Sequence, residues 1–145
     1  MNQDLIFIPL LIQIILTLFV FYRIGAVKEE AVKNGEVDQS RRALHDDAWP
    51  ESVQKVNNNI RNQFETPVLF YVLVILLWLL GAAGPLAQAI ALAYALLRIA
   101  HARVHLGSNI VRLRKRLFQA SMVMLFILTG LVLLALVDPG LSGNL

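Results

Sequence analysis

Apolar residues fall into four long runs that polar segments separate. These runs predict helices over residues 5–22, 54–80, 85–106 and 109–137. A helix needs about 20 residues to cross the hydrocarbon core of a bilayer. In the second run only residues 67–80 are continuously apolar, so this helix also needs the polar turns before them. No strand-like alternation occurs, and a membrane-crossing backbone must satisfy its own hydrogen bonds, so helices are the predicted structure.

Glycine and proline mark the ends of these runs. Gly81 to Pro85 predicts a tight hairpin between the second and third helices, and Pro50 suits the first turn of the second. Gly107 interrupts the chain before the fourth helix. The only long connection covers residues 23–49. The pattern therefore predicts one all-α membrane domain over residues 1–145, built as a four-transmembrane-helix bundle.

Composition and charge agree with a membrane protein of defined orientation. Hydrophobic residues make up 57% of the 145 residues, more than a small soluble domain can bury. All 13 lysines and arginines lie in or next to the first and third connections. The positive-inside rule then predicts cytoplasmic basic loops and both termini outside, in a multi-pass protein of a bacterial inner membrane. The chain has no cysteine, which excludes disulfides and cysteine nucleophiles.

The first hydrophobic run is predicted to remain as a membrane span. A cleavable signal peptide begins with basic residues and ends at a small-residue cleavage site. Here the residues before the run include neither lysine nor arginine, and the run leads directly into Arg23.

A polar face precedes the apolar part of the second helix. Asn58, Asn62 and Glu65 follow i, i+4, i+7 spacing, with Arg61 beside them. A carboxylate at membrane depth marks a functional site by default. The alternative is a polar helix end at the headgroup level, where Glu65 pairs with Arg61.

A second polar group spans the third and fourth helices. Arg98, His101 and His105 are about one turn apart, and Arg112 falls in the first turn of the fourth helix. Two histidines at i, i+4 can bind a metal, but no third ligand has suitable spacing, so no metal site is predicted. Interfacial snorkelling is the alternative, and residues 114–116 are predicted to contact anionic lipid headgroups. Together the two groups predict a polar cavity for a small zwitterionic or anionic ligand.

The segment from Asn62 to Tyr71, with its Asn-Gln-Phe-Glu-Thr-Pro start, resembles the second-helix signature of the MAPEG family, the membrane-associated proteins in eicosanoid and glutathione metabolism. The Arg98, His101, His105, Arg112 series is similar to the family's Arg, Tyr, Tyr, Arg pattern. The chain resembles a bacterial-type member over its whole length. This resemblance implies a homotrimer that binds glutathione as co-substrate between subunits, with a small hydrophobic co-substrate entering from the bilayer.

The resemblance also implies roles for individual residues. Glu65 would meet the glutathione amino group, Asn62 would bond the glutathione backbone and Arg98 would help to order the site. Arg112 would stabilise the thiolate, because a nearby cation lowers the pKa of a thiol. Two features depart from the family pattern: histidines replace both tyrosines, and Asn58 stands near the position of a family arginine.

Three functions follow as hypotheses. The first is a membrane-bound glutathione-dependent transferase or peroxidase acting on lipophilic electrophiles or lipid hydroperoxides. The second is a non-catalytic protein that binds a lipid headgroup or anionic metabolite in the same inter-subunit cavity. The third is a small transporter, which the sequence disfavours because Gln13 is the only strongly polar side chain inside the first span. The predicted partners are membrane lipids and further copies of the chain; no nucleic acid is expected.

Overall fold

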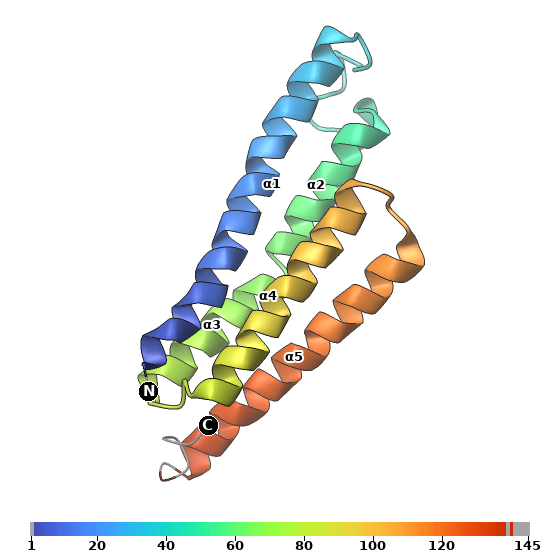
Figure 1. The fold of residues 1–145 in the computed structure, drawn as a ribbon. Helices are drawn as coiled ribbons and strands as arrows, with labels where there is room; N and C mark the ends of the chain where they lie inside the picture. Colours follow the sequence, from blue (N-terminus) through green and yellow to red (C-terminus); the bar gives the residue numbers. More distant parts are fainter. Residues whose placement is uncertain (1, 139, 141–145) are drawn as a thin grey trace.

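The computed structural model describes residues 2–138 and 140, and these residues form helices and connections without any strand (Figure 1). Four helical units are long and apolar enough to cross a membrane, and α2 and α3 together form one of them. This confirms the predicted all-α four-span fold. The elements are η1 (Gln3–Ile6), α1 (Phe7–Lys33), η2 (Asp46–Ala48), α2 (Glu51–Gln63), α3 (Thr66–Leu79), α4 (Pro85–Leu106) and α5 (Val111–Val137).

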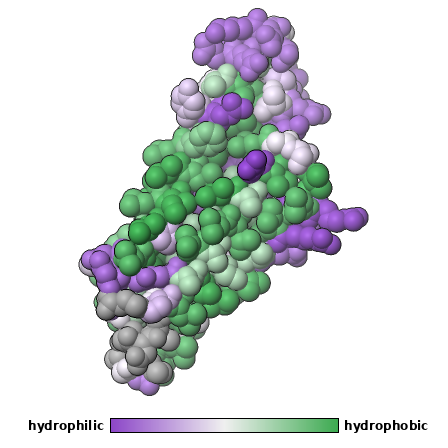
Figure 2. Space-filling model, in the orientation of Figure 1, coloured by the Kyte–Doolittle hydropathy of each residue, from purple (hydrophilic) through white to green (hydrophobic). Residues whose placement is uncertain are grey.

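The four units run side by side along one bundle axis. The start of α1, the α3–α4 hairpin and the end of α5 lie at one end, and the other two connections lie at the opposite end (Figure 1). Figure 2 shows a hydrophobic band between hydrophilic regions at the two ends. Both basic connections therefore share one end of the bundle, which we call the loop end.

The hairpin at the other end is a Schellman turn. Gly81 has a φ of 70°, a conformation that suits glycine because it has no Cβ. The Ala82 N–H donates to the Leu77 carbonyl at 2.8 Å, and the Gly81 N–H donates to the Trp78 carbonyl at 3.1 Å. These two bonds are the pattern that satisfies the last carbonyls of a helix, so α3 ends here and α4 can return antiparallel to it.

The first helix continues well beyond its apolar run, to Lys33 rather than Tyr22. Val27 and Ala31 in this extension belong to a buried cluster that also contains Val53 and Val56 of α2. An apolar stripe on one face of a helix packs against a neighbouring helix, whereas a helix surrounded by lipid is apolar on all faces. The α1–α2 pair therefore extends the bundle beyond the apolar band at the loop end.

The first connection is held by polar contacts. An Arg41 nitrogen lies 2.8 Å from an Asp47 oxygen, and this guanidinium lowers the pKa of the Asp47 carboxyl. The Lys28 ammonium lies 4.9 Å from the centre of the Trp49 ring, a cation–π distance. The connection is thus folded against the end of α1.

A chain of buried amides links three helices inside the bundle. Gln13 Nε2 donates to Gln63 Oε1 at 2.8 Å, and Gln63 Nε2 donates to Asn59 Oδ1 at 2.9 Å. Asn59 Nδ2 then donates to the Ala102 carbonyl at 3.3 Å. All three amide side chains are buried. Since a buried polar group is costly when it is unpaired, this chain fixes α1, α2 and α4 relative to one another.

This geometry predicts an order of stabilities for two substitutions. Gln63→Leu leaves both the Gln13 donor and the Asn59 acceptor without a partner, so we expect it to lower the free energy of unfolding by about 1–2 kcal/mol. Gln13→Leu leaves only the Gln63 Oε1 acceptor unpaired, and it removes Gln13 Oε1, which already has no partner. It should therefore lower the free energy of unfolding by less than Gln63→Leu does. Thermal unfolding in detergent measures both. Ile8→Leu, at a position of α1 that is exposed and lines none of the cavities, is the control. A larger loss for Gln13→Leu than for Gln63→Leu would contradict the proposed order.

Candidate functional site

The second span breaks at Phe64 and Glu65, where the sequence pattern predicted a continuous helix. α2 ends at Gln63 and α3 begins at Thr66, with Pro67 in the first turn of α3. Proline has no N–H to donate to the carbonyl four residues earlier, and its ring clashes with that carbonyl. The last carbonyls of α2 therefore need other donors.

Arg98 of α4 supplies one of these donors. Its Nη2 donates to the Asn62 carbonyl at 2.7 Å, and the side chain is fully buried. A cation at a helix C-terminus is favourable because of the helix dipole and the free carbonyls. The Nε and Nη1 atoms of Arg98 are buried without a hydrogen-bond partner. Arg98 thus holds the broken end of α2 while keeping unused donor capacity.

A cavity of about 210 Å³ lies beside this break. Three elements contribute to its wall: the α2–α3 break, α4 and the first two turns of α5. Its lining residues are Asn62, Glu65, His101, Val111, Arg114, Lys115 and Phe118. We call this space the break cavity.

Charges of both signs line the break cavity. Glu65 is exposed, and among the residues that the structure describes it forms no ion pair. Arg114 is partly buried; its Nη1 donates to Asn109 Oδ1 at 2.6 Å, while its Nε is buried without a partner. Lys115 adds a second cation. One carboxylate and two cations in one cavity suit a ligand that itself carries both charges.

The two histidines pack against each other on α4. The rings of His101 and His105 meet edge to face with centroids 5.7 Å apart, and both side chains are buried. The Nδ1 atom of each ring has no hydrogen-bond partner. Across residues 2–138 and 140, no group of three His, Cys, Asp or Glu side chains could hold a metal ion.

The structure brings together only part of the predicted site. Asn62, Glu65 and His101 line the break cavity, while Arg98 and His105 are buried but do not line it.

Three other predicted residues lie away from the cavity wall. Arg61 forms an ion pair with Asp46 of η2 rather than with Glu65. Asn58 is exposed, and its backbone carbonyl accepts a hydrogen bond from Asn62 Nδ2 at 2.8 Å. Arg112 is exposed in the first turn of α5.

Sequence reasoning assigned the contribution of the fourth helix to Arg112 and missed two other residues of α5. It treated residues 114–116 as one group of lipid-facing cations, whereas Arg114 and Lys115 line the break cavity. The helical period could have predicted this contribution. The residues with i, i+3, i+4, i+7 spacing, which share one face, are Val111, Arg114, Lys115 and Phe118. Arg116 is not on that face.

Comparison with known proteins identifies one matching family. The model of the MAPEG family matches residues 6–134. The matched range contains nearly all of the four spans and every residue that lines the break cavity. No curated protein and no solved structure matches the chain.

Proposed function

The chain belongs to the MAPEG family, and from this membership we propose that it is a membrane-bound glutathione-dependent transferase or peroxidase acting on lipophilic electrophiles or lipid hydroperoxides. The observation that carries the proposal is the break cavity, where the Glu65 carboxylate and the Arg114 and Lys115 cations line one space. Glutathione has one ammonium and two carboxylate groups, so its charges complement this set.

The polar groups of the cavity suggest how glutathione binds. Glu65 accepts from the ligand ammonium, and Arg114 and Lys115 donate to its carboxylates. Asn62 offers an amide to the peptide backbone of the ligand. Hydrogen bonds between charged groups are the strong ones, and Arg is suited to carboxylates because its donors form a planar fork.

The homotrimer that the family membership implies is part of this proposal, and the size of the cavity suggests that a neighbouring copy contributes to the site. Pockets for small ligands usually measure about 300–1,000 Å³, whereas the break cavity of one chain measures about 210 Å³. One chain thus provides part of a pocket, and we propose that a neighbouring copy completes it.

Arg112 is the residue that we propose stabilises the thiolate. It lies in the first turn of α5, where the positive end of the helix dipole adds to its own charge. Both influences lower the pKa of a thiol and raise the fraction of nucleophilic thiolate at neutral pH. The thiolate sulfur then bonds to an electrophilic carbon and displaces its leaving group.

The distribution of charge suggests the orientation. We propose that the protein lies in a bacterial inner membrane with the loop end in the cytoplasm, because all 13 basic residues lie in or next to the two loop-end connections. The break cavity then lies toward the cytoplasmic side, where the reducing environment keeps thiols reduced.

A second candidate function is non-catalytic binding of a lipid headgroup or an anionic metabolite in the same inter-subunit cavity. The exposed position of Arg112, outside the cavity wall, favours this alternative. Retention of a phospholipid that glutathione cannot displace, seen by native mass spectrometry, would support it over the enzyme.

Calorimetry of glutathione binding in detergent tests the proposed function. We expect the wild type to bind glutathione and Glu65→Gln to bind it about tenfold more weakly, because a charged hydrogen bond to the ligand ammonium becomes a neutral one. Glu51→Gln, an exposed acidic residue at the start of α2, is the matched control and should bind like the wild type. No binding by the wild type, together with no thiol-dependent turnover on a panel of electrophiles, would exclude the enzyme.

A further inference from the structure

A second and larger cavity lies between α1 and α4, on a different side of α4 from the break cavity. It measures about 640 Å³, and none of its lining residues lines the break cavity. We call it the α1–α4 groove. Its wall consists of Ile12, Ile15, Leu16, Phe19 and Arg23 from α1 and Ile99, Ala102, Arg103, Leu106 and Gly107 from α4 or its end.

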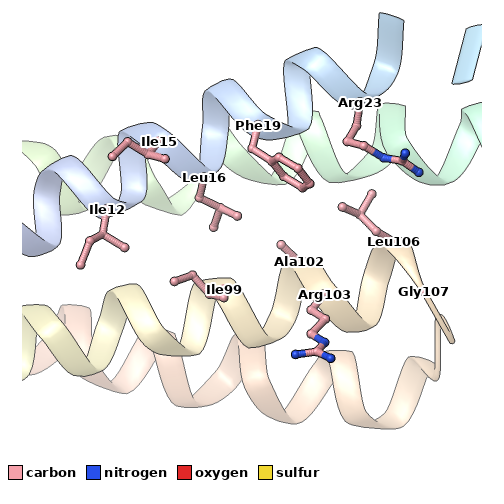
Figure 3. A pocket seen from close by; sticks show the side chains of 10 residues that line it. All are labelled: Ile12, Ile15, Leu16, Phe19, Arg23, Ile99, Ala102, Arg103, Leu106 and Gly107. Atoms are coloured by element: carbon pink, nitrogen blue, oxygen red, sulfur yellow. The ribbon is translucent and has the colours of Figure 1, made fainter. Parts of the chain in front are cut away.

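The walls of the groove are apolar, and its two charged residues have the same sign. Figure 3 shows the aliphatic and aromatic side chains of the two helices along the groove, with Arg23 toward the loop end of α1 and Arg103 on α4. Both arginines are exposed, and neither forms an ion pair with another described residue. No acidic residue lines the groove. An occupant therefore needs an apolar body and an anionic end.

The length of the groove matches one leaflet of a bilayer. From Ile12 to Arg23 the helix rises roughly 16 Å at 1.5 Å per residue. Half of the hydrocarbon core measures about 15 Å. An acyl chain that starts at the level of Arg23 and runs toward Ile12 would thus follow the groove from the interface to the bilayer centre.

We infer that the α1–α4 groove binds an anionic membrane phospholipid, with one acyl chain along the apolar walls and the phosphate at the level of Arg23, where Arg103 on the α4 wall adds a second positive charge. Arg suits this role because its planar fork can donate two hydrogen bonds to a phosphate. The apolar walls fix the depth of the lipid, and the two cations select its charge. This site is independent of the proposed glutathione site, so either can fail without the other.

Native mass spectrometry tests the charge selection. Protein in detergent is mixed with equal amounts of phosphatidylglycerol and phosphatidylcholine, and the retained lipids are counted. Since each cation near the membrane surface attracts an anionic lipid by about 1 kcal/mol, two of them predict a preference for phosphatidylglycerol of about tenfold or more. Arg23→Gln/Arg103→Gln should lose most of this preference. Arg42→Gln/Lys55→Gln changes the net charge equally away from the groove and should keep it.

Fluorescence quenching tests the location of the lipid. In a Trp49→Phe/Trp78→Phe background, which removes the two native tryptophans, Phe19→Trp places a reporter in the groove. Val123→Trp in the same background places one at a position on α5 that is 51% exposed and lines none of the cavities. In vesicles of phosphatidylcholine with phosphatidylglycerol, brominated phosphatidylglycerol should quench the first reporter more than brominated phosphatidylcholine does. The two brominated lipids should quench the reporter on α5 equally.

Three outcomes would overturn the inference. Equal lipid preference in the wild type and the Arg23→Gln/Arg103→Gln variant would show that the two arginines do not select the lipid. Equal quenching of the reporter in the Phe19→Trp variant by both brominated lipids would show that the groove holds bulk lipid only. No quenching of that reporter by either lipid would show that another copy of the chain covers the groove.

Discussion

Arg114→Gln is expected to weaken glutathione binding by roughly 10- to 100-fold, the equivalent of one lost charge-assisted hydrogen bond of about 1.5–3 kcal/mol. Arg114 is the partly buried cation of the break cavity, and its Nε has no protein partner although it is buried. Such an atom is available to a ligand carboxylate. Calorimetry in detergent at low salt measures the change, and the melting temperature shows whether the lost bond to Asn109 has disturbed the fold.

Two nearby arginines on α5 make this prediction specific. Arg116→Gln removes the same charge from an exposed position outside the cavity wall, and we expect glutathione affinity to change by less than about threefold, as for a screened surface charge. Arg112→Gln should instead lower turnover at saturating glutathione by about 100-fold, the usual cost of removing an electrostatic stabiliser of a reacting anion. If Arg116→Gln weakened binding as much as Arg114→Gln, affinity would come from the general basic charge of α5 rather than from the cavity.

The apolar runs were sufficient to predict the four spans, because lipid imposes a length and a composition on each helix. They were not sufficient to predict where α1 ends. Residues 23–33 carry several charges, so a criterion based on apolar runs ends the helix near Tyr22. Only the spacing of Val20, Val27 and Ala31 indicates a stripe that another helix covers. The partner of that stripe, on α2, follows a long connection and is visible only in the folded chain.

Sequence periodicity also predicted only part of the candidate site. Spacing along one helix correctly placed Asn62 and Glu65 close together, because they are less than one turn apart. It also grouped Arg61 with them, yet Arg61 contacts Asp46, a residue 15 positions away in a connection whose path has no periodic signal. The break caused by Pro67 adds a further change of direction that a continuous helical wheel cannot show. Local periodicity thus predicts neighbours within an element, whereas contacts between elements depend on the connections.

Arg98→Met is expected to weaken glutathione binding by about tenfold or more while changing the free energy of unfolding by less than about 1 kcal/mol. Methionine matches much of the length of arginine without its charge. The substitution loses the hydrogen bond to the Asn62 carbonyl, which is destabilising, and it removes a buried guanidinium with two unpartnered nitrogens, which is stabilising. These two effects oppose each other in the stability of the fold.

In ligand binding, the loss of the Arg98 hydrogen bond and the removal of the buried guanidinium do not offset each other. Arg98 acts on the ligand through α2, because its bond to Asn62 holds the broken helix end that carries Asn62 and precedes Glu65. Without that bond the two residues lose their fixed position in the cavity wall, and ligand binding must then supply the ordering free energy. Arg98→Lys, which keeps a charged donor, should recover part of the affinity, measured by the same calorimetry beside thermal unfolding. If Arg98→Met bound glutathione like the wild type, the break would be held by the backbone around Pro67 alone, and Arg98 would have no positioning role.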